Sequence, residues 1–250
     1  MGALHAGHLS LIKQSINQCN HTVVSIFVNG KQFSPDEDFE KYPRTLSEDV
    51  IKLESLNVDV LFLPENNEIY PENYSTYIEE NNLSIGLESA SRPHFFKGVL
   101  TVVLKLFNII QPDFSFFGKK DIQQLRLVEK MVQDLNLQIV IIAGETIREK
   151  GGLAMSSRNT YLQKPDGLGI IYETLKNAKN TIQSGERKSS IIHNQIHKSL
   201  TTVPNLRVDY IEISNAKTLK SVEKIEQNII ISLAVFVGEV RLIDNIEVLI

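Results

Sequence analysis

Residues 1–16 read MGALHAGHLSLIKQSI, a histidine-bearing turn followed at once by apolar residues with helical spacing. We therefore predict a helix whose first turn carries His5 and His8 on one face. A helix start offers unpaired N–H groups and partial positive charge, and Gly7 lets a phosphate or purine approach the backbone closely. A histidine pair three residues apart also occurs in metal sites and on exposed helix starts, so this motif alone leaves those alternatives open.

A second motif, Met155-Ser156-Ser157-Arg158-Asn159, follows the midpoint of the chain. It supplies two hydroxyl groups and a permanently charged guanidinium, which suit a triphosphate and the charge that grows on it during transfer. The sequence contains neither HExxH nor paired cysteines, which weakens the metal interpretation. The two motifs together predict two parts of an ATP-handling site.

Strand and helix patterns alternate through the first three fifths of the chain, in the order strand 22–28, helix 46–56, strand 58–63, helix 99–110, strand 114–117, helix 122–135 and strand 138–143. This alternation predicts an α/β fold with a doubly wound parallel sheet of Rossmann type. Ligands of such sheets bind beyond the carboxyl ends of the strands, where Asn29, Gln32 and residues 118–121 fall.

The pattern changes after residue 146. Helices are predicted over 168–184 and 191–200, followed by strands over 206–213, 228–237 and 240–246. We expect a nucleotide-binding domain over 1–146 and a smaller α+β domain over 147–250, with a hinge at 144–152.

Composition narrows the class of protein. The 250 residues are 42% hydrophobic, enough for one substantial core and a second, smaller one. A net charge of -4 without a basic run argues against nucleic-acid binding and favours small-molecule partners. The single cysteine, Cys19, cannot form an internal disulfide, and no apolar run is long enough to span a bilayer. We expect a cytoplasmic protein that does not contact membranes.

Several motifs in the same order closely resemble the pantoate–β-alanine ligase (pantothenate synthetase) family over nearly the whole chain. They are Met1-Gly2-Ala3-Leu4-His5-Ala6-Gly7-His8-Leu9-Ser10, Val28-Asn29 with Gln32-Phe33, Tyr42-Pro43-Arg44-Thr45, Phe117-Gly118-Lys119-Lys120-Asp121 with Gln123-Gln124-Leu125, Leu153-Ala154-Met155-Ser156-Ser157-Arg158-Asn159 and Arg241-Leu242-Ile243-Asp244. Several motifs in one order are more specific than any of them alone.

The resemblance implies ATP-dependent condensation of pantoate with β-alanine to pantothenate through a pantoyl adenylate, with release of pyrophosphate and AMP. It implies Mg²⁺ with the ATP, a homodimer, and His8 as the catalytic histidine. The donors and cations that fit the chemistry of the transfer are His5, His8, Lys120 and Arg158. The ATP-binding residues it implies are Met1, Gly2, Ala3, Leu4, His5, Ala6, Gly7, His8, Gly118, Lys119, Lys120, Asp121, Ile147, Met155, Ser156, Ser157 and Arg158. The predicted substrate-binding residues are Gln32, Gln124, Asn29 and Arg92.

The chain departs from the family at three places. Members normally have a strand directly before the position of Met1, which the printed sequence does not include, so we expect unpaired backbone at the neighbouring strands. Gly30 replaces a proline, which should loosen the loop that presents Gln32. His94 occupies a glycine position, at a cost of about 1 kcal/mol if the backbone there is left-handed.

Two other functions are compatible with parts of the sequence. One is a nucleotidyltransferase that shares the His-x-Gly-His start and stops at adenylyl or cytidylyl transfer. Gln32, Gln124 and residues 117–121 argue against it. The other is a degenerate, non-catalytic nucleotide-binding protein, which the departures above would produce.

Overall fold

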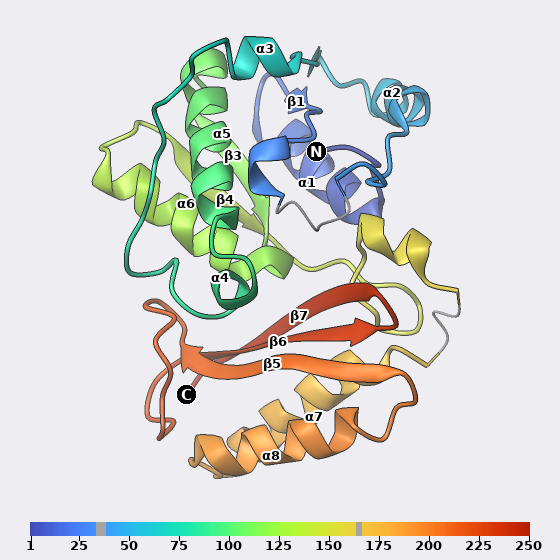
Figure 1. Cartoon of the computed structure of the whole chain (residues 1–250), viewed down its shortest axis with the longest axis vertical. Helices are drawn as coiled ribbons and strands as arrows, with labels where there is room; N and C mark the ends of the chain where they lie inside the picture. The colour runs from blue at the N-terminus through green and yellow to red at the C-terminus, as the bar shows by residue number, and fades with distance from the viewer. Residues whose placement is uncertain (34–38, 164–166) are drawn as a thin grey trace. The chain divides into compact units, whose positions relative to one another are not determined.

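The computed structural model describes residues 1–33, 39–163 and 167–250. The chain forms two compact units, which are described separately (Figure 1). The first comprises Met1–Lys119 and Gln123–Glu145, and the second comprises Lys120–Ile122 and Thr146–Ile250. None of the described helices is long and apolar enough to cross a membrane.

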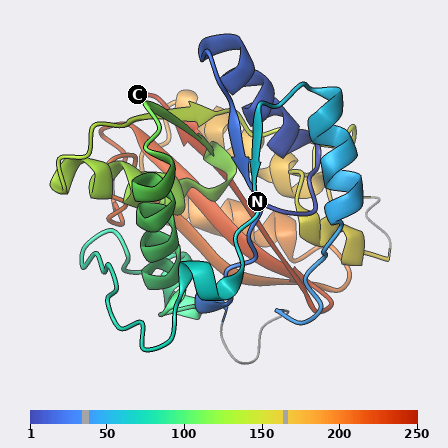
Figure 2. The ribbon, with the colours of Figure 1, turned by 90° about the horizontal axis from the view of Figure 1, so that it is seen from above.

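The first unit alternates helices and short strands, as Figure 2 shows from above. Its elements are α1 (Ala6–Gln18), β1 (Val23–Ser25), η1 (Gly30–Gln32), α2 (Leu46–Ser55), β2 (Val60–Phe62), α3 (Asn66–Ile69), α4 (Glu88–Ser91), α5 (Phe95–Ile110), β3 (Phe114–Gly118) and β4 (Val140–Gly144). The 3-10 turn η2 (Lys119–Asp121) leads from β3 into α6 (Ile122–Asp134).

All the described strands of this unit pair in parallel, which confirms the predicted α/β class. β1 pairs with β2, with Val24 opposite Leu61, and β3 pairs with β4, with Phe116 opposite Ile142. The strands form two hydrogen-bonded pairs rather than one continuous sheet, because no described strand bonds to both β1 and β3. Met1 lies against the other edge of β1: its nitrogen donates to the Ser25 carbonyl at 3.0 Å, and its carbonyl accepts from the Phe27 N–H at 3.2 Å.

Apolar faces of the helices cover these strand pairs. Ile12 of α1 packs with Val24 of β1 and Leu53 of α2, and all three are at most 3% exposed. A second cluster joins α5 and α6 through buried residues that include Leu100 and Leu127. Burial of this kind contributes about 1.5–3 kcal/mol for each large side chain, so these clusters fix the strand ends from which the loops emerge.

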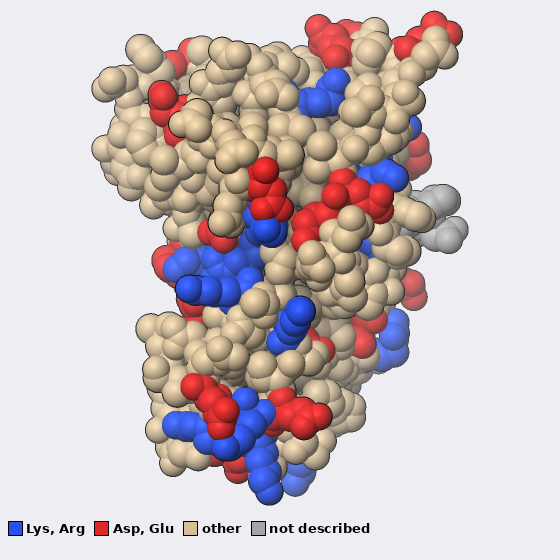
Figure 3. Space-filling model, turned by 90° about the vertical axis from the view of Figure 1, so that its left-hand side faces the viewer, with Lys and Arg blue, Asp and Glu red and all other residues tan. Residues whose placement is uncertain are grey.

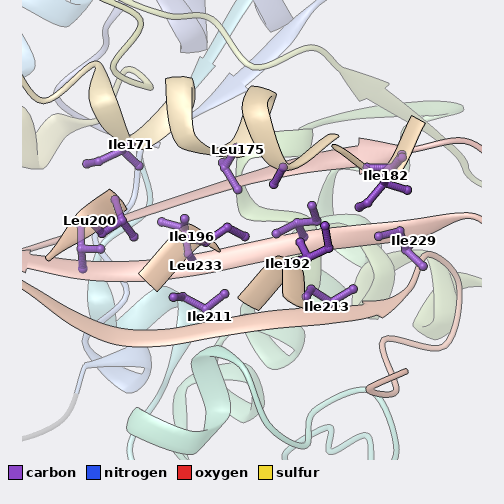
Figure 4. Close-up of a cluster of buried hydrophobic side chains, with 14 of the residues drawn as sticks. Ile171, Leu175, Ile182, Ile192, Ile196, Leu200, Ile211, Ile213, Ile229 and Leu233 are labelled. Atoms are coloured by element: carbon purple, nitrogen blue, oxygen red, sulfur yellow. The ribbon is translucent and has the colours of Figure 1, made fainter. Parts of the chain in front are cut away.

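The second unit is a three-stranded antiparallel sheet with two helices. Its elements are η3 (Ser157–Tyr161), α7 (Ile170–Gln183), α8 (Ser189–Leu200), β5 (Leu206–Asn215), β6 (Ile229–Val237) and β7 (Val240–Val248), and the strand order is β5-β6-β7. Figure 4 shows Leu175 of α7 and Ile196 of α8 directed toward Ile211 and Leu233 of the sheet. The predicted small α+β unit is confirmed.

Charged side chains are interspersed on the surface. On the face drawn in Figure 3, lysine and arginine side chains lie in separate groups with aspartate and glutamate beside them. In the second unit Lys224 pairs with Glu226 at 2.5 Å, which holds the pKa of that carboxyl below its usual value. Such exposed pairs contribute little to the free energy of unfolding.

Candidate active site

The predicted helix start is confirmed, and His5 is its N-cap residue. Nδ1 of His5 accepts from the Gly7 N–H at 3.1 Å, and Nδ1 of His8 accepts from the His5 N–H at 3.4 Å. The ring centroids lie 4.0 Å apart. Because Nδ1 is the acceptor in both rings, the proton of each neutral imidazole lies on Nε2. The reciprocal cap therefore makes each Nε2 a hydrogen-bond donor.

Two side chains of α2 bind the backbone of Leu4, the residue before this cap. The Leu4 N–H donates to Oδ1 of Asp49 at 2.7 Å, and Nζ of Lys52 donates to the Leu4 carbonyl at 2.8 Å. We call these two bonds the Leu4 clamp. Asp49 is 1% exposed, and its Oδ1 lies 3.6 Å from Nζ of Lys52. The clamp fixes the backbone directly beside Ala3, whose φ of 48° is left-handed and costs an alanine about 1–2 kcal/mol.

Three of the predicted substrate-binding residues lie together at η1. Nδ2 of Asn29 donates to Oε1 of Gln32 at 3.3 Å, and Arg92 donates to the Gln32 carbonyl at 3.2 Å. The Arg92 guanidinium also lies 3.7 Å from the ring centre of Phe95. The structure therefore brings Asn29, Gln32 and Arg92 into one cluster at the carboxyl end of β1.

Asn29 is 2% exposed, and its neighbours satisfy its amide. Its Nδ2 donates to the Gly98 carbonyl at 3.1 Å, and its Oδ1 accepts from the Tyr70 hydroxyl at 2.9 Å. Burial raises the pKa of the Tyr70 phenol, so this group stays a neutral donor. A Cβ at Gly98 would overlap the Lys31 carbonyl, so glycine allows α5 to approach η1 this closely. Tyr70 belongs to no motif, so its contact with Asn29 could not be predicted from the sequence.

Gln123 and Gln124 lie side by side on α6 but have different surroundings. Gln123 is 3% exposed: its Oε1 accepts from the Glu88 N–H at 3.0 Å, and its Nε2 donates to the Leu83 carbonyl at 2.8 Å. The Gln124 amide has no hydrogen-bond partner among the described residues and is half-buried. Gln123 is therefore structural, and Gln124 retains both a donor and an acceptor for a ligand.

Gly118 ends β3, and the predicted ATP-binding residues Lys119, Lys120 and Asp121 form η2 directly after it. The Lys119 ammonium pairs with the Glu145 carboxylate. Nζ of Lys120 lies 3.9 Å from Oδ1 of Asp121, and the Lys120 side chain is 19% exposed. These residues therefore lie at the carboxyl end of a parallel strand, where ligands of such sheets bind.

In the second unit, the predicted ATP-binding residues Ile147 and Met155 face each other. The Met155 N–H donates to the Ile147 carbonyl at 2.9 Å, and Arg148 bridges Ala154 in antiparallel fashion. We call residues 147–155 the 147–155 hairpin. Ser156 then caps η3: its Oγ accepts from the Arg158 N–H at 3.3 Å. Ser157 is 8% exposed, so its hydroxyl is less accessible than its place in the motif indicates.

Arg148 fastens the 147–155 hairpin to β7. Its guanidinium makes two bonds to the Asp244 carboxylate, at 2.6 and 2.9 Å, and one to the Gly152 carbonyl at 3.1 Å. It lies 3.4 Å from the ring centre of Tyr172. Beside it, Asn159 donates to Oε1 of Glu149 at 2.7 Å. Arg148 and Glu149 belong to none of the sequence motifs, so these contacts could not be predicted from the sequence.

Two departures from the family have a clear local structure. His94 has a φ of -98°, so the backbone there is not left-handed and the strain expected under that condition does not arise. Gly30 does not need glycine for its φ, and a Cβ there would lie 3.3 Å from the Phe39 ring. The loosening expected at Gly30 stays a prediction. The hydrogen bonds of Asn29 to the Gly98 carbonyl and the Tyr70 hydroxyl restrain this loop.

Parallel strands alternating with helices, with lysine and amide side chains beyond the strand ends and a histidine-capped helix start, place the chain in the Rossmann-type class of nucleotide-binding α/β proteins. The chain belongs to the pantoate-β-alanine ligase family, whose sequence model matches residues 1–247. A pantothenate synthetase from Thermosipho africanus is 50% identical over 247 residues, which cover 98% of this chain and 88% of the relative. One from Fervidobacterium nodosum is 51% identical with the same coverage.

Solved structures of the same family are similar to this chain. Pantothenate synthetase from Thermus thermophilus superposes with a TM-score of 0.95 at 38% identity, covering 100% of this chain and 91% of that one. A pantoate-β-alanine ligase from Francisella tularensis, described as complexed with β-γ ATP and β-alanine, gives a TM-score of 0.76 at 37% identity, covering 98% and 86%.

Proposed function

We propose that this chain condenses pantoate with β-alanine to pantothenate through a pantoyl adenylate, consuming ATP and releasing pyrophosphate and AMP. The observation that carries the proposal is the family match over residues 1–247. The His5–His8 cap supports it independently, because its Nδ1 bonds leave the proton of both rings on Nε2 at a helix start that favours anions.

In the first step a pantoate carboxylate oxygen attacks the α-phosphorus of ATP. A P–O bond forms to the carboxylate, and the bond from the α-phosphorus to the bridging oxygen breaks as pyrophosphate leaves. The carboxylate is already ionised at neutral pH, so the step needs positioning and charge neutralisation rather than a base. We assign the phosphate contacts to His5, His8, Lys120 and Arg158. Loss of one such donor typically raises the barrier by about 3–4 kcal/mol.

The amide and arginine cluster at η1 is our proposed pantoate site. Gln32 and Gln124 each offer a donor and an acceptor, which suits a substrate with hydroxyl groups and a carboxylate. Asn29 shapes the loop from a buried position, and its amide is already satisfied by protein atoms. Arg92 is held against Phe95 and the Gln32 carbonyl, so we assign it to loop and substrate contacts.

In the second step the neutral amine of β-alanine attacks the acyl carbon of the adenylate. The C–N bond forms, the bond from the acyl carbon to the AMP oxygen breaks, and the amine nitrogen releases a proton to solvent. Gln32 is the residue we place nearest β-alanine. We assign adenosine contacts to Met1–Leu4, Gly118, Ile147 and Met155, where backbone groups and small or apolar side chains suit a purine and ribose.

Mg²⁺ is proposed as the ion that accompanies ATP. Such ions are held mainly by phosphate oxygens and waters, with one or two carboxylates at most. Asp121 fits this need, because its side chain is 48% exposed and lies next to Lys120 in η2. When bound, the ion would neutralise phosphate charge. We also propose that the protein is a homodimer, which sedimentation tests. We propose a cytoplasmic location, where ATP is abundant, and cell fractionation tests it.

The products distinguish this reaction from the alternatives. With pantoate, β-alanine, ATP and Mg²⁺ we expect pantothenate and AMP in equal amounts. A nucleotidyltransferase would transfer the nucleotide without consuming β-alanine, and a degenerate protein would bind ATP without turnover. ADP and phosphate as products would contradict the proposal.

A further inference from the structure

Two adjacent residues of β7, Asp244 and Asn245, each hold one of the segments of the second unit to which ATP binding is assigned. Nδ2 of Asn245 donates to the Lys120 carbonyl at 2.8 Å, across 125 positions of sequence. Asp244 is 3% exposed and binds both arms of Arg148, whose backbone lies in the 147–155 hairpin. Two neighbouring residues of β7 therefore hold both η2 and the 147–155 hairpin.

The two anchors are also joined to each other. The Asn245 N–H donates to Oδ1 of Asp244 at 2.8 Å, so the carboxylate that holds Arg148 also fixes the backbone that presents Asn245. β7 is held in turn by its antiparallel pairing with β6, where Asp244 lies opposite Leu233 and Asn245 opposite Ser232. A rigid sheet is a better base for such contacts than a loop.

From this arrangement we infer that Asn245 is a positioning residue for Lys120 in the adenylate-forming step. The inference rests on the phosphate role proposed for Lys120. A lysine side chain has four rotatable bonds, so the direction of its Cα–Cβ bond must be set by the backbone. The Asn245 bond fixes the peptide plane between Lys120 and Asp121, and with it that direction. Outer-shell residues that orient metal ligands typically change affinity or activity about 10- to 100-fold when mutated, and we expect an effect of the same size here.

The test uses Asn245→Ala and Asn245→Asp, the second of which keeps the shape but replaces the donor with an acceptor. Asn228→Ala is the matched control, since it removes one hydrogen bond, to the Ile250 N–H at 3.0 Å, outside the proposed site. We expect both Asn245 variants to slow single-turnover pyrophosphate release about 10- to 100-fold. Reaction of preformed pantoyl adenylate with β-alanine should stay within about twofold of wild type, because Lys120 is proposed to act on the departing pyrophosphate.

A second readout does not depend on turnover. Acetic anhydride labelling of the free protein, followed by mass spectrometry, should show a changed Lys120 rate in both Asn245 variants, with Lys119 as the internal reference. Equal slowing of both half-reactions, or wild-type adenylation with unchanged Lys120 labelling, would overturn the inference. If the wild-type protein forms no adenylate, the proposed function fails, and the labelling alone decides whether Asn245 positions Lys120.

Discussion

Replacement of Asp49 by alanine should destabilise the first unit, because the Leu4 clamp would lose its acceptor. The Leu4 N–H is buried and donates to Asp49 over only 2.7 Å, a charge-assisted bond worth about 1.5–3 kcal/mol. The Lys52 ammonium is 35% exposed and keeps its bond to the Leu4 carbonyl, so loss of the ion pair adds less than about 1 kcal/mol. The expected loss in the free energy of unfolding is therefore about 1.5–4 kcal/mol.

Thermal unfolding followed by circular dichroism measures this loss. In a chain of this size 1 kcal/mol corresponds to about 2–4 °C, so Asp49→Ala should lower the Tm by about 3–16 °C. Glu48→Ala is the matched control: it removes the same charge from the same helical turn, but Glu48 is exposed. Its Tm should fall by about 2 °C or less. Equal Tm changes in the two variants would refute the clamp.

Three further changes have defined outcomes. Tyr70→Phe removes the donor to Asn29 and should raise the KM for pantoate several-fold in steady-state assays, with kcat nearly unchanged. Burial raises the Tyr70 pKa above its ordinary value of 10, so above about pH 10 this phenol ionises in the unfolded chain before it does in the folded one. The free energy of unfolding of the wild-type protein should therefore fall above about pH 10. Denaturant titrations should show a smaller fall in Tyr70→Phe. Arg148→Lys loses the paired bonds to Asp244 and should lower the Tm by several degrees; an unchanged Tm would contradict the fastening role. His8→Ala should slow single-turnover adenylation by more than about 100-fold while ATP binding, measured by calorimetry, changes little; an unchanged adenylation rate would exclude the role given to Nε2.

Periodicity predicts the presence of the longer elements, but not every boundary: the helix predicted over 99–110 begins earlier, as α5 (Phe95–Ile110). The predicted helices 46–56 and 122–135 match α2 (Leu46–Ser55) and α6 (Ile122–Asp134) within one residue at each end. The strand predicted over 22–28 shortens to β1 (Val23–Ser25), because a strand extends only as far as its partner bonds to it. α3 and α4 have four residues each, too few for a helical repeat to be visible in sequence.

Some residues of the candidate site could be predicted from the sequence, and others could not. His5 and His8 could be identified because a helix start is a local feature. Asp49 and Lys52 could not, since charged residues three apart on an amphipathic helix are typical of a solvated face. Their role follows from contacts to Leu4, which lies 45 or more positions away in the chain. Asn245 is likewise recognisable only once β7 is placed beside Lys120.

The central claim is that the reaction passes through an acyl adenylate, and isotope transfer tests it most directly. Pantoate labelled with ¹⁸O in its carboxylate is incubated with this protein, ATP, Mg²⁺ and β-alanine, and the nucleotide product is analysed by mass spectrometry. The carboxylate oxygen that attacks the α-phosphorus remains on AMP when the amine displaces it. We predict one ¹⁸O atom in each AMP formed. Label in inorganic phosphate, or AMP without label, would contradict the account.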